Sequence, residues 1–146
     1  ILIERRITFF EYYTLPIHMS DVFSKEKITD AESEILDDLD SDILFLINHD
    51  FETEHQLLGY PRALQGSVNF WWAVKYLGIE KQSYSDEELK LLYDEEDNFV
   101  LLLQVNFCDQ KIEIDRFGDC VAYFGIHKDD LRKQKFENAI LVMQNI

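Results

Sequence analysis

Basic residues are scarce in this sequence. Its 146 residues include 14 Lys and Arg against 29 Asp and Glu, which gives a formal net charge of −15 at pH 7. A chain with this charge is repelled by nucleic-acid phosphates and by anionic lipid headgroups. We therefore expect no nucleic-acid partner and no membrane partner. The charge would attract a basic protein, a peptide or a metal ion, although it also serves solubility alone.

Cysteine, proline and glycine are also sparse, with two, two and five residues. Cys108 and Cys120 are too few for a disulfide framework and lack the paired spacing of a zinc site. No apolar run reaches the ~18 residues of a membrane span, and the first ten residues carry Glu4, Arg5 and Arg6, unlike a secretory signal. The simplest interpretation is a cytoplasmic protein with reduced thiols.

Hydrophobic residues, by contrast, make up 47% of the chain, and aromatic residues 14%. This is the composition of a folded globular protein, and a chain of this length buries roughly 68 to 70% of its unfolded surface. We therefore expect a single domain over residues 1–146. Because the first residue is Ile1 and not Met, we expect that it is not the natural start.

Helical patterns dominate the first two thirds of the chain. Residues 3–13, rich in β-branched and aromatic types, predict a strand that precedes them. A capping-box pattern at Thr29 then begins a long helix that ends near His49, with apolar residues at helical spacing along one face.

Two shorter helices follow. Ser67 caps a helix over residues 68–77, which Gly78 ends. Ser85 opens another helix through Tyr93, and the acidic residues that follow Tyr93 are expected to break it.

Strand patterns dominate the last third. Residues 99–107 form a continuous apolar run, which predicts a central strand buried on both faces. Further strands are predicted at 112–115, 120–126 and 139–143, with a helical turn or two within 128–135. Because the helices come early and the strands late, we predict an α+β fold with a mainly antiparallel sheet.

Three motifs carry a resemblance to a known family. They are His-x-Leu-Leu-Gly-Tyr-Pro-x-x-x-Gln at 55–65, Leu-Leu-Leu-Gln at 101–104, and Phe-Gly-Asp at 117–119 leading to Tyr-Phe at 123–124. Together they resemble the bacterial YwqG-like family, a domain of unknown function, over about residues 5–145.

The resemblance implies a fold and no mechanism, because this family has no established catalytic residues. Family members usually carry a preceding β-rich half, so the resemblance also implies that this chain lacks an N-terminal half. One departure is that Cys120 is followed directly by Val121, where members commonly have another glycine.

The segment 55–66 is the candidate ligand site. Arg62 is the one Lys or Arg between residues 28 and 74, a stretch with ten Asp and Glu. Its guanidinium could hold a carboxylate or phosphate, with His55, Tyr60 and Gln65 completing a polar pocket, or it could pair with neighbouring acids inside the fold.

A metal site is a related alternative. Residues 49–55 hold two His and three acidic side chains, which is suitable ligand chemistry for a divalent transition metal, but their spacing matches no standard zinc or calcium loop. A solvated acidic loop is the competing interpretation. We leave the metal undecided and expect no cofactor.

An acidic stripe on the long helix is the candidate partner surface. Glu34, Asp38 and Asp42 repeat every four residues, and Asp37 lies beside them. Like charges at this spacing cost about 0.2 to 0.5 kcal/mol per pair, which a basic partner would offset. A merely solvated face is the alternative.

Signatures of catalysis are few. The chain has no nucleophile elbow, phosphate loop, dinucleotide fingerprint or His-Glu-x-x-His motif. The thiol of Cys108 has Asp109 beside it, which should raise its pKa, and Gly118-Asp119 is ordinary turn chemistry. An enzyme is therefore less favoured than a binding protein.

The leading hypothesis is an acidic protein-interaction module that holds a basic protein, for example as an inhibitor or immunity partner of a toxin. The alternative is a small-molecule or metal-binding protein, or an enzyme, with its site at residues 55–65. A third hypothesis is that the aromatic helix 68–77 contacts a missing N-terminal half or a second copy of the chain.

Overall fold

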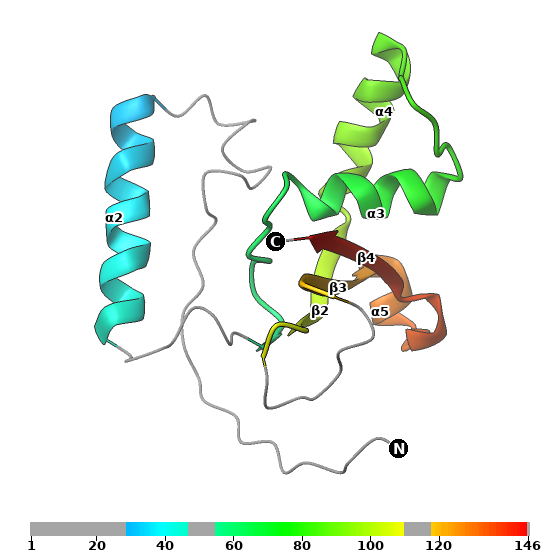
Figure 1. Ribbon diagram of the computed structural model, residues 1–146. Helices are drawn as coiled ribbons and strands as arrows, with labels where there is room; N and C mark the ends of the chain where they lie inside the picture. The colour runs from blue at the N-terminus through cyan, green and yellow to red at the C-terminus, as the bar shows by residue number, and fades with distance from the viewer. Residues whose placement is uncertain (1–28, 47–54, 110–117, 146) are drawn as a thin grey trace.

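The computed structural model describes residues 29–46, 55–109 and 118–145 and shows an α+β fold (Figure 1). Four strands form one antiparallel sheet in the order β1-β2-β3-β4. They are β1 (Gln56–Leu57), β2 (Phe99–Asn106), β3 (Cys120–His127) and β4 (Ile140–Asn145). The predicted fold class is thus confirmed.

The helices are α2 (Asp30–Leu46), α3 (Val68–Leu77), α4 (Asp86–Glu96) and α5 (Lys128–Arg132), with a 3₁₀ turn η3 (Phe136–Asn138). No helix within the described ranges is both long and apolar enough to span a bilayer. The strands predicted at 3–13 and 112–115, and the acidic loop before His55, lie outside the described residues.

A bulge in β2 decides which side chains meet on one face of the sheet. Leu101 pairs with Gly125 and Leu103 with Phe124, so Leu102 is an extra residue between them. The extra residue turns Gln104 to the same face as Leu101, and both are buried. The prediction that this strand is buried on both faces is therefore wrong, because burial is concentrated on one face.

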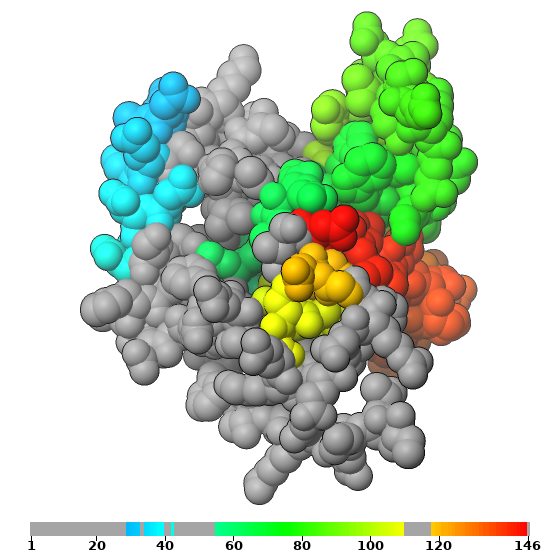
Figure 2. Space-filling model, viewed as in Figure 1, coloured from blue at the N-terminus to red at the C-terminus, as the bar shows by residue number. Residues whose placement is uncertain are grey.

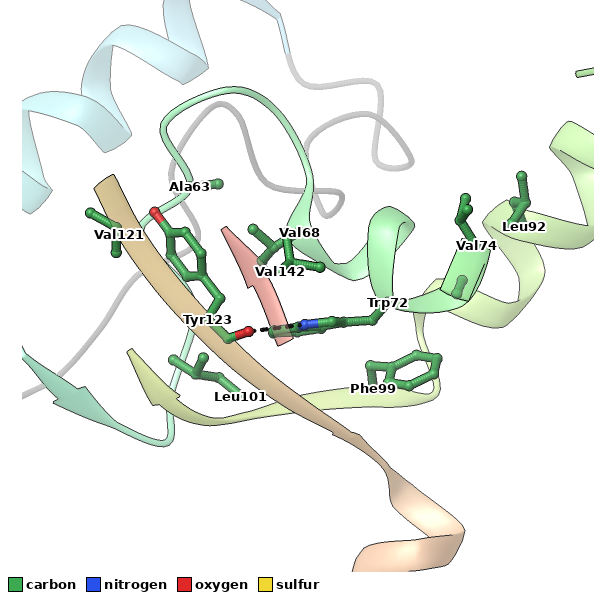
Figure 3. Packing of buried hydrophobic residues seen from close by; sticks show 11 residues of the cluster. Ala63, Val68, Trp72, Val74, Leu92, Phe99, Leu101, Val121, Tyr123 and Val142 are labelled. Atoms are coloured by element: carbon green, nitrogen blue, oxygen red, sulfur yellow. Dashed lines mark hydrogen bonds between the residues drawn. The ribbon is translucent and has the colours of Figure 1, made fainter. Parts of the chain in front are cut away.

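Helix α3 covers this face of the sheet through Trp72. The Trp72 side chain is fully buried, and its Nε1–H donates to the Tyr123 carbonyl at 3.4 Å (Figure 3). Gly125 lies two residues further along β3, on the same face, and a Cβ there would overlap the indole ring. The aromatic ring therefore lies directly on strand backbone. The other members of this core are Ala63, Val68, Ala73, Val74, Leu92, Phe99, Leu101, Val121 and Val142.

Local capping signals set the helix starts that the sequence predicts. At the start of α2 the Glu32 carboxylate accepts from the Thr29 amide and from the Thr29 hydroxyl, and these two bonds lower the pKa of the carboxyl. The Thr29 hydroxyl oxygen in turn accepts from the Glu32 amide. Ser67 accepts from the Phe70 amide, and Gly78 ends α3 with a φ of 68°. All three predictions are confirmed.

Helix α4 continues to Glu96, so its predicted end at Tyr93 is wrong. Its last turn is anchored from outside the helix: His127 donates from Nε2 to Glu95 at 3.1 Å, and Lys128 Nζ donates to the Asp97 carbonyl at 2.6 Å. These tertiary contacts place cationic or donor groups at the negative end of the helix, where the acidic run alone would be unfavourable.

We predict that Gly125→Ala destabilises the fold by about 1 to 3 kcal/mol, because the new methyl group must displace the indole of Trp72. Gly78→Ala is the control. A Cβ added at Gly78 would meet no atom within 4 Å, so the substitution costs only the strain of an alanine at a φ of 68°, about 1 kcal/mol. Denaturant unfolding measures both. A Trp72→Phe background should reduce the cost of Gly125→Ala, and equal costs in the two backgrounds would contradict the packing.

The Glu88 carboxylate provides a pH test of the α4 start. It accepts from Lys81 Nζ at 2.6 Å and from the Ser85 amide at 2.9 Å, and these bonds lower its pKa from 4.5 to about 2. Its stabilising contribution is thus present above pH 4.5 and is lost as pH falls toward 2. Lys81→Met should raise this pKa in an NMR titration, whereas Lys90→Met should not. An unchanged pKa in Lys81→Met would contradict the assignment.

Candidate functional site

The segment between β1 and α3 crosses the same face of the sheet that α3 covers. It turns sharply at Leu58 and Gly59, whose φ angles are 61° and 78°. Such a segment cannot satisfy its own backbone polar groups as a helix or strand would. The sheet supplies the missing partners.

One side chain from each strand contributes to a row that binds this segment. Gln56 pairs with Gln104, Gln104 pairs with Tyr123, and Tyr123 pairs with Val142, so these positions share one face. Gln144 lies two residues beyond Val142, on that face. We call Gln56, Gln104, Tyr123 and Gln144 the polar row. All four are buried.

Gln56 holds the turn. Its Nε2 donates to the Leu58 carbonyl at 2.6 Å and to the Tyr60 carbonyl at 2.8 Å. Leu58 itself has a left-handed backbone conformation, which is uncommon for a non-glycine residue and costs energy. The two bonds therefore help to fix this strained conformation.

Arg62 is held through its backbone. Its N–H donates to Gln104 Oε1 at 3.0 Å, and its carbonyl accepts from the Tyr123 hydroxyl at 2.7 Å. Burial raises the pKa of the Tyr123 hydroxyl, so it remains a proton donor. Both backbone groups of Arg62 are thus satisfied by neighbouring strands.

Gln144 holds the end of the segment. Its Oε1 accepts from the amides of Leu64 and Gln65 at 2.7 and 3.1 Å, and its Nε2 donates to the Gly66 carbonyl at 2.9 Å. One amide side chain therefore satisfies three backbone groups of a chain region about 80 residues away in sequence.

His55 joins the start of β1 to the end of β2. Its Nδ1 accepts from the Asn106 amide at 3.2 Å, so the proton of the neutral ring lies on Nε2, which faces Asp109 Oδ2 at 3.1 Å. The Asp109 side chain is buried. The imidazole and the carboxylate thus form a pair that links two strands.

The four residues of the candidate ligand site differ in what their side chains do. The His55 side chain is engaged with Asp109. Arg62 is half-buried. Burial raises the pKa of the Tyr123 hydroxyl, and the charge of Arg62 opposes this increase. Tyr60 and Gln65 are exposed, although Gln65 is fixed through its backbone. This arrangement does not test whether the four residues bind a ligand, so the ligand site stays a prediction.

Helix α2 presents the acidic stripe to solvent. Glu34, Asp38 and Asp42 are exposed, and Asp37 is half-buried. Of the apolar residues on this helix, Ile35 is 66% exposed and Leu39 45%. The helix therefore shows carboxylates and aliphatic side chains to solvent together, and Figure 1 places it apart from α3 and α4.

The surroundings of both thiols raise their pKa values. Burial and the nearby Asp119 carboxylate raise the pKa of Cys108, whose Sγ lies 4.0 Å from Asp119 Oδ1. The predicted direction is confirmed, but the acid named for it, Asp109, instead faces His55. Burial also raises the pKa of Cys120. Within the part of the chain that the structure describes, no three His, Cys, Asp or Glu side chains gather to hold a metal ion.

One protein-family model matches almost the whole chain. Residues 3–144 match the family described as a domain of unknown function, DUF1963. The chain belongs to this family. Comparisons with curated proteins and with solved structures returned no match. The polar row and α2 are therefore features of a DUF1963 domain whose activity has to be argued from its own residues.

Sequence reasoning missed the polar row of this DUF1963 domain. The available signal is that Gln104 and Gln144 each follow an apolar run of strand residues, where burial of an amide requires hydrogen-bond partners. Their partners lie in the irregular segment 58–66. The sequence alone does not pair these side chains with that segment, because the pairing depends on the register of the sheet.

We predict that Gln144→Leu destabilises the DUF1963 domain by about 2 to 5 kcal/mol, because it leaves the Leu64 and Gln65 amides and the Gly66 carbonyl without their partner. Gln65→Ala should change stability by less than about 0.5 kcal/mol, since its side chain is exposed. Denaturant unfolding compares the two. Equal stabilities would show that the polar row does not hold the segment.

Proposed function

We propose that this DUF1963 domain is an acidic protein-interaction module that binds a basic protein through α2. The observation that carries the proposal is that Ile35 and Leu39 are exposed on the same helix as the carboxylates of Glu34, Asp38 and Asp42. A solvated helix requires no exposed aliphatic residues, whereas protein interfaces combine an apolar centre with a polar rim.

The charge of the chain favours a basic partner. A net charge of −15 raises the rate at which a cationic protein meets this surface and repels another acidic one. Binding would also relieve the repulsion within the stripe, where Asp38 lies four residues from both Glu34 and Asp42. A toxin inhibited by an immunity-type partner is one class of basic protein that fits.

A second candidate function is small-molecule binding at the segment 55–66. The positive φ of Leu58 favours this function, because non-glycine residues with strained backbone angles are concentrated at functional sites. Tyr60 and the backbone-fixed Arg62 would then supply the polar contacts of the ligand. This candidate predicts that an Arg62→Ala variant keeps its fold and loses the ligand.

The test of the leading proposal is affinity capture from the native cell lysate with two variants of equal charge. Glu34, Asp38 and Asp42 to Lys should abolish recovery of a basic partner. The matched control changes three exposed acids elsewhere to Lys, namely Glu80, Asp129 and Glu137, and should retain it. Recovery should also fall with added salt, since the Debye length shrinks from ~10 Å at 0.1 M to ~3 Å at 1 M.

The apolar half of the surface is tested separately. Ile35→Ser with Leu39→Ser should weaken capture of the same partner at every salt concentration, because the lost contacts are not electrostatic. Equal recovery by the parent and by both α2 variants would overturn the proposal and leave the 55–66 segment as the remaining candidate.

A further inference from the structure

A second surface lies on α3 and α4. We propose that the aromatic cluster formed by Phe70, Trp71, Tyr84 and Tyr93 is a docking surface for arginine or lysine side chains of a basic protein segment. The inference rests on the proposed function only in taking the partner to be basic. It places the contact on different residues.

The four rings form one connected group around Phe70. Its centroid lies 5.6 Å from that of Trp71 and 5.9 Å from that of Tyr84, with near-perpendicular planes of 89° and 86°. Tyr93 lies 5.8 Å away at 48°. These contacts fix the orientations of the four rings relative to one another.

The outer rings of the aromatic cluster are exposed. Trp71 is 41% exposed and Tyr93 46%, whereas the adjacent Trp72 is fully buried in the core. The neighbouring Leu91 on α4 is also exposed. Exposed Trp and Tyr side chains that are held rigid are the residues most enriched among the strongest contacts of protein interfaces.

The aromatic cluster already accepts one cation from within the chain. Lys81 Nζ lies 5.8 Å from the centroid of the Tyr84 ring, within the range of a cation–π contact. In the proposed complex a partner's guanidinium or ammonium makes the same kind of contact with the exposed rings of Trp71 and Tyr93. Lys81 Nζ also donates to the Glu88 carboxylate, so this cation contacts an aromatic ring and an acid together, which is the combination proposed for the partner.

The charge around the aromatic cluster selects the same occupant. Helix α4 exposes Asp86, Glu87 and Asp94, against the one lysine of that helix, Lys90. These carboxylates attract a cationic segment and repel a second copy of this acidic chain, so the charge favours a basic partner over self-association. The helix that carries Tyr93 thus also exposes acidic side chains, a combination that suits cationic side chains.

The aromatic cluster and the acidic stripe are separate surfaces. Figures 1 and 2 show α2 on one side of the molecule and the α3–α4 pair on the other. Variants on one helix therefore leave the other surface intact, and the two contacts can be tested independently.

The experiment titrates the full chain with an oligo-arginine peptide, and with a glycine–serine peptide of equal length as the uncharged control. Calorimetry measures affinity and tryptophan fluorescence reports the contact, because Trp71 is exposed while Trp72 is buried and serves as an internal reference. Trp71→Leu and Tyr93→Leu remove one aromatic face each and keep an apolar side chain. Phe136→Leu removes an exposed aromatic ring outside the aromatic cluster. Thermal unfolding confirms that each variant is folded.

The proposal predicts that oligo-arginine changes the emission of Trp71 and that Trp71→Leu and Tyr93→Leu each weaken binding about threefold to thirtyfold, with Phe136→Leu unchanged. Added salt should weaken peptide binding by every variant, but the ratio of the affinities of the parent and of Trp71→Leu should stay unchanged. Absence of binding by the parent, or equal affinity of parent and both cluster variants, would overturn it.

The α2 variant with Glu34, Asp38 and Asp42 changed to Lys separates this inference from the proposed function. If that variant alone loses the peptide, the aromatic cluster is not the docking surface and the α2 proposal stands. If the cluster variants alone lose it, the cluster is the contact for cationic side chains, whatever α2 binds.

Discussion

The structure depends on holding an irregular backbone segment against a sheet while pairing the polar groups that meet there. Residues 58–66 lie across one face of the sheet and form neither helix nor strand, although the Leu58 amide donates to the Leu102 carbonyl of β2. The polar row supplies amide and hydroxyl groups at the required places, one side chain from each strand. Because an unpaired buried donor or acceptor costs about 1 to 3 kcal/mol, the row determines whether this face can be closed at all.

The rest of the core follows from the same face. The bulge at Leu102 turns Gln104 inward beside Leu101, so one strand contributes both an apolar contact and a polar one. Gly125 leaves room for the Trp72 indole to lie on the backbone next to Tyr123, whose carbonyl it binds. Helix α3 and the segment 58–66 are therefore positioned side by side over adjacent parts of β3, and a register shift in this strand would disturb both.

How far the sequence predicts this molecule depends on the range of the interaction. Helix starts at Thr29, Ser67 and Ser85 are encoded within four residues, and they were predictable. The end of α4 and the one-sided burial of β2 depend on groups distant in sequence, such as Lys128 and the bulge partner Gly125. The acidic stripe could be read from the sequence, but the exposure of Ile35 and Leu39 beside it could not, because helical periodicity predicts an apolar face and does not show what covers it.

The segment 55–66, which the sequence marks as the candidate ligand site, is thus bound to the sheet through its backbone. The backbone of residues 58–66 is fixed by the polar row, while the exposed features proposed to bind a partner lie on α2 and on the aromatic cluster. The most direct test of this account is hydrogen exchange, followed by NMR, at the amides of Arg62, Leu64 and Gln65. The account predicts slow exchange comparable to that of the central strands, because each amide donates to a buried glutamine oxygen. Exchange as fast as that of an exposed loop would contradict it.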